Sequence, residues 1–407
     1  MMNYNAAGKL GFGFMRMPLT NPKDDTSIDM PVLEKMVDSF FDAGFTYCDT
    51  AWMYHAHMSE PTVGRAVVAR HPRESFTVAS KMPAWMIRSH KKGVEIFEAQ
   101  KEKLGIDYFD YYLVHDMNAA NYKKAQQFDM ISYLREKRAS GEIRCLGFSC
   151  HDTAEHIDRV LTECPFFEFV QLQINYLDWE SDDVQSRRCY EVCVKHGVPV
   201  IVMEPVKGGT LAKVSKKVET LLRSVHPDWS LASWALRFAA GLPGVKVVLS
   251  GMSTPKQVAE NVALFREMAE QTDGIKKISK GNTMGSLTQH EILGEEELRT
   301  LAQAAAMIRG TIAIPCTGCR YCVEENSCPK QIPIAKYFSL YNTAKLEEVH
   351  GGADSDKLNQ KSEYMDYVNR GSGAAADCIT CRKCEQVCPQ HIRIADRLKE
   401  VSAVFDT

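Results

Sequence analysis

Eight of the 14 cysteines lie after residue 315, in two groups of nearly equal spacing. In each group, three cysteines are separated by two residues, and a fourth stands directly before a proline. This spacing aims three thiolates at different irons of one cubane, and the trailing Cys-Pro belongs to the same pattern. We therefore predict two 4Fe–4S clusters, bound by Cys316, Cys319, Cys322, Cys328, Cys378, Cys381, Cys384 and Cys388.

The fourth cysteine of each group lies too close along the chain to reach the cubane of its neighbours. We predict an exchange, in which Cys388 completes the cluster of Cys316, Cys319 and Cys322, and Cys328 completes the other. The gap before Cys328 is longer than usual and the groups lie far apart, so the exchange stays a hypothesis. Zinc, which more often binds separated Cys-x₂-Cys pairs or mixed Cys/His ligands, and disulfides are the alternatives.

A second set of residues that could do chemistry follows or closes β-rich runs. In a parallel barrel the carboxyl ends of the strands converge on one face, where active sites lie. One such residue would mean little, since an Asp after a strand is often a helix cap and a His is often a core group. Equivalent placement of five side chains favours a site, which they would form together: Asp49, Lys81, His115, Ser149 and Gln171.

The elements that must position these residues are short apolar runs separated by helical patterns such as Met30–Ala43, Gly93–Leu104 and Thr153–Thr162. This alternation predicts a parallel α/β domain, and a length of about 250 residues fits a closed (β/α)₈ TIM barrel. An open doubly wound sheet is disfavoured, because no strand is followed by G-x-G-x-x-G. The expected strands are Gly8–Phe14, Thr46–Asp49, Phe76–Ser80, Tyr108–Val114, Arg144–Ser149, Phe169–Gln173, Pro199–Met203 and Lys246–Ser250.

The chain of 407 residues exceeds the usual size of one core, about 250–300 residues. We expect the barrel over 1–270, a linker and helix over 271–310, and a mainly α-helical two-cluster domain over 311–407. Within the linker, 271–294 is expected to be a polar loop and Glu295–Arg309 a helix. A net charge of -3 gives no indication of nucleic-acid binding. The polar start and the absence of an apolar run near ~20 residues predict a cytoplasmic protein without a membrane span.

The motifs around these residues resemble those of the aldo-keto reductase family over roughly residues 8–265. The tail resembles a dicluster ferredoxin module, and such fusions occur within the family. The family has an Asp, Tyr, Lys and His in this order on successive strand ends, and all four have counterparts here. The matching segments are Asp49-Thr50-Ala51 with Tyr54, Ala79-Ser80-Lys81, Leu113-Val114-His115, Ser59-Glu60, Val63-Gly64, Gly147-Phe148-Ser149 and Glu260-Asn261.

The resemblance implies a carbonyl reduction in which a hydride leaves an alkoxide that must be protonated. A phenol with a pKa near ~10 is a poor acid at pH 7 unless its conjugate base is stabilised. The ammonium of Lys81 would stabilise the phenolate of Tyr54, and Asp49 would hold Lys81 in place and charged. His115 would orient and polarise the carbonyl oxygen.

The resemblance also assigns Ser149 and Gln171 to the nicotinamide carboxamide. Cys150 stands where the family usually has an Asn that contributes to the same contact. Met203 stands where an aromatic side chain often stacks on the nicotinamide ring, and a thioether can pack on that face. Simple packing inside the barrel is the other interpretation of Met203.

The family's 2′-phosphate clamp, a Lys-Ser and an Arg, is replaced here by Gly251-Met252 and Gln257. An arginine fork binds phosphate with two hydrogen bonds, so its absence leaves NADH and NADPH both open. Lys256 could substitute as a point charge. Glu260 and Asn261 are expected to contact the adenosine.

These residues together predict an NAD(P)-linked enzyme that reduces a small carbonyl or oxidises an alcohol, with clusters that exchange electrons with a one-electron redox protein. Hydride transfer moves two electrons together and a cluster passes one. A flavin would bridge the two, but no motif supports one. The alternatives are an electron-transfer module whose barrel does not turn over, and clusters with a purely structural role.

Overall fold

A computed structural model describes residues 8–278, 290–324, 328–349 and 354–406. These residues form two compact units. The first contains the eight strands. The second contains everything from Gly294 onward together with two segments that follow strands of the barrel, Asn175–Val184 and Val206–Ala235.

The eight strands close into a parallel barrel in sequence order, as the sequence predicts, with β1 hydrogen-bonded to β8. Each expected run overlaps one strand, although β3, β4, β5 and β8 extend beyond the expected bounds. Because the barrel is closed, the open-sheet alternative is wrong. The strands are β1 (Leu10–Gly13), β2 (Tyr47–Asp49), β3 (Thr77–Pro83), β4 (Tyr111–His115), β5 (Leu146–Cys150), β6 (Phe169–Gln173), β7 (Val200–Met203) and β8 (Val245–Ser250).

The helices between the strands are amphipathic. In α1, Asp29 caps the first turn by accepting a hydrogen bond from the Val32 amide at 3.2 Å, and buried residues recur at helical spacing from Leu33 to Phe40. The barrel helices are α1 (Met30–Asp42), α2 (Ser59–Val63), α3 (His90–Leu104), α4 (Ala119–Gln127), α5 (Met130–Ser140), α6 (Ala154–Glu163), α7 (Ser186–Lys195), α8 (Lys216–Val225), α9 (Leu231–Ala240) and α10 (Pro255–Ile278).

The barrel interior is filled by side chains from most of the strands, including Tyr47, Ala79, Leu113, Phe169 and Ile201. Because side chains alternate along a strand, the residue two positions later points to the same side. Those later residues carry the polar groups of the sequence analysis: Asp49, Lys81, His115 and Gln171, with Met203 at the end of β7. The barrel core therefore aims the polar set at the carboxyl ends of the strands.

The polar loop expected over 271–294 is partly wrong, because α10 continues to Ile278. Extending an existing helix costs less than starting one, and the segment contains no proline. Residues 279–289 lie outside the described residues. The expected helix over Glu295–Arg309 is present as α11.

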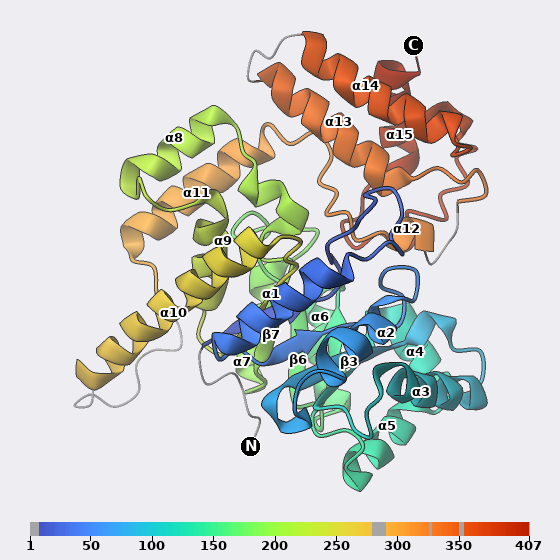
Figure 1. Cartoon of the computed structure of the whole chain (residues 1–407), viewed down its shortest axis with the longest axis vertical. Helices are drawn as coiled ribbons and strands as arrows, with labels where there is room; N and C mark the ends of the chain where they lie inside the picture. Colours follow the sequence, from blue (N-terminus) through green and yellow to red (C-terminus); the bar gives the residue numbers. More distant parts are fainter. Residues whose placement is uncertain (1–7, 279–289, 325–327, 350–353, 407) are drawn as a thin grey trace. The chain divides into compact units, whose positions relative to one another are not determined.

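The C-terminal region is helical and matches the predicted class (Figure 1). Its core joins α13 and α15 to residues of the two cysteine groups, through buried side chains such as Tyr337, Phe338, Tyr364 and Phe405. Its helices are α12 (Tyr321–Glu324), α13 (Ile334–Val349), α14 (Asp354–Asn369) and α15 (Ile394–Phe405). Among the described residues no helix is both long and apolar enough to cross a membrane.

Candidate active site and cluster ligands

Lys81 is the centre of a buried polar group at the ends of β2 and β3. Its Nζ donates hydrogen bonds to Asp49 Oδ1 at 2.6 Å and to the Thr50 carbonyl at 2.8 Å. Its third and longest bond, 3.4 Å, goes to the hydroxyl of Tyr54, which lies in the loop after β2. An ammonium has three donors, so this arrangement satisfies the fully buried Lys81 completely and points it at the phenol.

The charge of Lys81 depends on Asp49. Burial lowers the pKa of Lys81, and the charge and hydrogen bond of Asp49 oppose that shift, with a smaller contribution from Glu60. Burial, followed by the charge of Lys81, lowers the pKa of His115 well below its ordinary value. His115 is therefore neutral near pH 7 and can hydrogen-bond to a substrate without adding a second positive charge.

Aromatic rings surround this group. The His115 ring lies edge-on to Tyr54, with centroids 6.0 Å apart, and its centroid is 5.0 Å from that of Trp85. The backbone after Tyr54 turns left-handed at three successive residues, His55, Ala56 and His57, with φ of 52°, 51° and 72°. The rare conformation at non-glycine residues next to the phenol marks a constrained loop.

The expected nicotinamide residues lie beside this group. Gln171 Nε2 donates to Asp49 Oδ2 at 3.0 Å, which fixes the second oxygen of that carboxylate. Ser149 Oγ accepts a hydrogen bond from the Asp116 amide at 2.9 Å. Met203 packs against the barrel-filling residues and is half-buried, so both interpretations of this residue remain.

In the region expected to bind the nucleotide phosphate, several side chains already have hydrogen-bond or ion-pair partners within the protein. Gln257 Oε1 accepts from the Ser253 amide at 2.7 Å, and Asn261 Nδ2 donates to Ser250 Oγ at 3.0 Å. Exposed Lys256 and Glu260 form an ion pair of 3.7 Å.

The structure adds a basic residue that the sequence reading missed. A Cβ atom placed on Gly251 would lie 3.1 Å from the Cδ of Arg16, so the arginine stem passes against that glycine. Arg16 lies three residues after the end of β1, and its position after a strand is the signal that could have found it.

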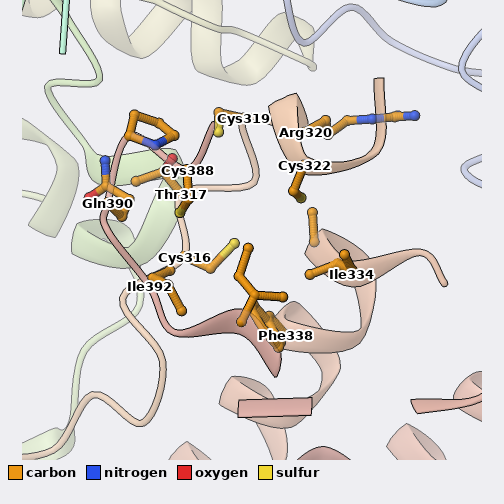
Figure 2. A pocket seen from close by; sticks show the side chains of 13 residues that line it. Cys316, Thr317, Cys319, Arg320, Cys322, Ile334, Phe338, Cys388, Gln390 and Ile392 are labelled. Atoms are coloured by element: carbon orange, nitrogen blue, oxygen red, sulfur yellow. The ribbon is translucent and has the colours of Figure 1, made fainter. Parts of the chain in front are cut away.

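The first cysteine group meets the last cysteine of the second. Cys316, Cys319, Cys322 and Cys388 line one pocket, and Figure 2 shows their four sulfur atoms facing a common space. Most of the other lining side chains are apolar, among them Phe338, and Thr317, Arg320 and Gln390 also line the pocket. Four thiolates around an apolar space fit one cubane, and they are the set that the exchange hypothesis groups together.

A backbone hydrogen bond to one of these sulfur atoms also supports cluster binding. The Gly318 amide donates to Cys316 Sγ at 3.4 Å, the kind of bond that tunes cluster sulfurs. Burial raises the pKa of the Cys384 thiol to about 12, and the charges of Glu385, Cys378 and Cys328 add to the shift. Cys328 thus lies near the second group.

Comparison with known proteins identifies both parts. The profile of the Aldo/keto reductase family matches residues 9–280. The chain belongs to this family. A 4Fe-4S dicluster domain matches residues 315–392.

The alignments with similar proteins span most of the length of each relative. An aldo-keto reductase of Mycolicibacterium smegmatis is 25% identical over 267 residues, 64% of this chain and 85% of the relative. The NADH-specific methylglyoxal reductase of Escherichia coli is 25% identical over 292 residues, 58% of this chain and 87% of the relative. A solved aldo-keto reductase from Klebsiella pneumoniae, in complex with NADP and acetate, has a TM-score of 0.52 at 20% identity, covering 72% of this chain and 90% of that chain.

A polar network behind this family's site was missed by sequence reasoning, because its members are far apart in the chain. Gln100, fully buried in α3, donates from Nε2 to Glu60 at 2.5 Å, to Ser80 at 2.9 Å and to the Lys81 carbonyl at 3.0 Å. Its Oε1 accepts from the Tyr112 hydroxyl at 2.5 Å. Burial raises the pKa of Glu60. Gln100 therefore holds the backbone of β3 where Lys81 is attached.

We expect Gln100→Leu to lower the free energy of unfolding by about 1–3 kcal/mol, because it leaves buried polar groups of Glu60 and Tyr112 without this partner. Anaerobic urea unfolding measures the change. Gln126→Leu, on the exposed face of α4, is the matched control and should change stability by less than about 0.5 kcal/mol. Equal effects of the two substitutions would contradict the role of the network.

The exchange of fourth ligands has a test in iron content. If Cys388 and Cys319 bind the same cluster, Cys388→Ala, Cys319→Ala and the double variant should each retain about four of eight irons. If each group closes on itself, the two single variants lose different clusters and the double variant retains none. Cys193→Ala, at a buried cysteine of the barrel, is the control and should keep all the iron.

Proposed function

We propose that this aldo/keto reductase reduces a small carbonyl compound, or oxidises the corresponding alcohol, with Tyr54 as the proton donor. The observation that carries the proposal is the buried Lys81 ammonium, held by Asp49 and hydrogen-bonded to the Tyr54 hydroxyl. A bound nicotinamide dinucleotide would supply the hydride. The protein supplies the proton, its placement and the exclusion of water.

The proton transfer follows from the charges. When Tyr54 gives its proton to the nascent alkoxide, the phenolate that remains is stabilised by the ammonium of Lys81. Asp49 keeps that ammonium charged despite burial. Neutral His115, whose ring faces Tyr54 edge-on, is placed to hydrogen-bond to the carbonyl oxygen.

Nicotinamide binding is assigned to the strand ends next to this group. Ser149 and Gln171 offer a hydroxyl and an amide to the carboxamide, and the half-buried Met203 offers an apolar face to the ring. Arg16, whose stem lies against Gly251, offers a basic side chain to the nucleotide phosphates. Proteins similar to this chain include one named for NADH and one solved with NADP, so the fold accommodates both.

The two 4Fe–4S clusters are proposed to exchange single electrons with a redox protein. The pocket that four of the cysteines line supports the binding of the first cluster. Cys316, Cys319, Cys322 and Cys388 would hold one cluster, and Cys378, Cys381, Cys384 and Cys328 the other.

Anaerobic oxidation of NADH and NADPH with a panel of aldehydes and quinones tests the proposal. Turnover with a carbonyl compound supports it. Absence of turnover with every carbonyl, in protein whose clusters bleach with dithionite, would make the barrel a scaffold for an electron-transfer module.

Tyr54→Phe removes the proton donor while keeping the ring. We expect kcat for carbonyl reduction to fall by about 10²–10⁴-fold, with nucleotide affinity nearly unchanged. Tyr108→Phe is the control and should retain activity, because Tyr108 lies against Arg144 and precedes β4, whereas His115 stands at the other end of that strand. Unchanged kcat in Tyr54→Phe would remove Tyr54 from the mechanism.

Nucleotide preference is expected to be modest, because Gln257 replaces the arginine of the clamp. Gln257→Arg should raise the ratio of kcat/KM for NADPH to that for NADH by about tenfold or more through charge-assisted bonds to the 2′-phosphate. Gln257→Glu should shift the ratio the other way. Strong NADPH selectivity in the unaltered protein would show that another cation, Arg16 or Lys256, already fills the role.

A further inference from the structure

The two cysteine groups fold into loops of the same conformation. Gly318 and Arg320 in the first loop have φ of 68° and 72°, and their equivalents Thr380 and Arg382 have 54° and 56°. The match continues beyond the fourth cysteines, where Gln331 and His391 have φ of 54° and 50°. The two cluster sites can therefore be compared position by position.

Equivalent positions of the two loops differ sharply in exposure. Thr317 is 2% exposed, whereas its equivalent Ile379 is 55% exposed. Tyr321 is buried, whereas its equivalent Lys383 is exposed. Of the 14 cysteines, all within the described residues, only Cys381 is exposed. The second loop thus faces solvent where the first does not.

A segment that follows β7 covers the first loop. A Cβ atom on Gly208 would lie only 2.1 Å from the Thr317 carbonyl oxygen, so the two backbones touch. The preceding residue, Lys207, is 2% exposed and donates to both oxygens of Asp178 at 2.7 Å and to Gln390 Oε1 at 2.8 Å. Gln390 lines the pocket of the first four cysteines.

At the equivalent position of the second site, the described residues leave the side chain exposed. Gln390 follows Cys388-Pro389, and the residue in the same place after Cys328-Pro329 is Lys330, which is exposed. A buried amide on one side thus corresponds to a solvent-facing ammonium on the other. The asymmetry makes the second cluster the one that another protein can approach.

We propose that residues 378–384, together with Lys330, form a docking surface for an acidic one-electron carrier protein. The proposal rests on the proposed electron exchange by the clusters. In each encounter the reduced carrier loses one electron and the cluster bound at Cys378, Cys381, Cys384 and Cys328 gains it, with no bond or proton transferred. Electron transfer slows steeply with distance, so the exposed loop is the point of entry.

Charge and apolar exposure specify the partner. Lys330, Arg382 and Lys383 are exposed cations on this surface, and Ile379 adds an apolar contact at its centre. Arg382 forms ion pairs with Glu385 at 3.4 Å and with Asp396 at 3.8 Å. Exposed Asp377 precedes the loop. Within residues 378–384 and Lys330 every charged side chain is a cation, which favours an acidic carrier.

The test is anaerobic stopped-flow reduction of the full protein by a prereduced, acidic plant-type 2Fe–2S ferredoxin. The second-order rate constant should fall with ionic strength, and Lys330→Glu/Lys383→Glu should lower it at least tenfold at low salt. Ile379→Asp should also lower it. Lys91→Glu/Lys92→Glu, on the exposed face of α3, matches the charge change and should leave the rate within twofold.

Dithionite reduces clusters without a docking surface. It therefore distinguishes a failure of the docking surface from a failure of the proposed electron exchange. It should bleach the clusters of every variant to the native extent, which shows that they are intact. Dithionite reduction without ferredoxin reduction, or equal ferredoxin rates in all variants, would overturn the docking surface and leave electron exchange standing. Clusters that dithionite does not reduce would overturn the electron exchange itself.

Discussion

The buried ion pair between Lys81 and Asp49 is the constraint on which the barrel site depends. Removing two charges from water costs several kcal/mol per ion, and only close, well-directed hydrogen bonds offset that cost. Here every donor of the ammonium has a partner, and both carboxylate oxygens are engaged, one by Lys81 and one by Gln171. The pair joins the adjacent strands β2 and β3, whereas Gln171 is on β6, so the full set of contacts forms only when the barrel closes.

A second buried ion pair has a corresponding role in the other unit. Lys207 and Asp178 follow β7 and β6, and Lys207 also contacts Gln390, next to the last cysteine. The loops after two barrel strands therefore belong to the same compact unit as the cluster ligands. This arrangement makes two sequence-equivalent cluster sites unequal, one covered and one open to solvent.

The sequence predicted much of this because its signals are local. Short apolar runs locate all eight strands, since a buried parallel strand needs a continuous apolar stretch. The cysteine spacing indicates two clusters because each loop must reach three irons of one cubane. Extension of α10 to Ile278 was missed, since a polar helix has no periodic apolar signal.

The sequence by itself determined the barrel, the residue types at the strand ends and the number of cluster cysteines. Only the tertiary structure decided which of them meet. Gln100 reaches Glu60, Arg16 lies against Gly251, and Lys207 reaches Gln390 over 183 positions of the chain. Contacts of this kind leave no periodicity or spacing in the sequence, because they depend on how closed strands and packed loops bring distant residues together.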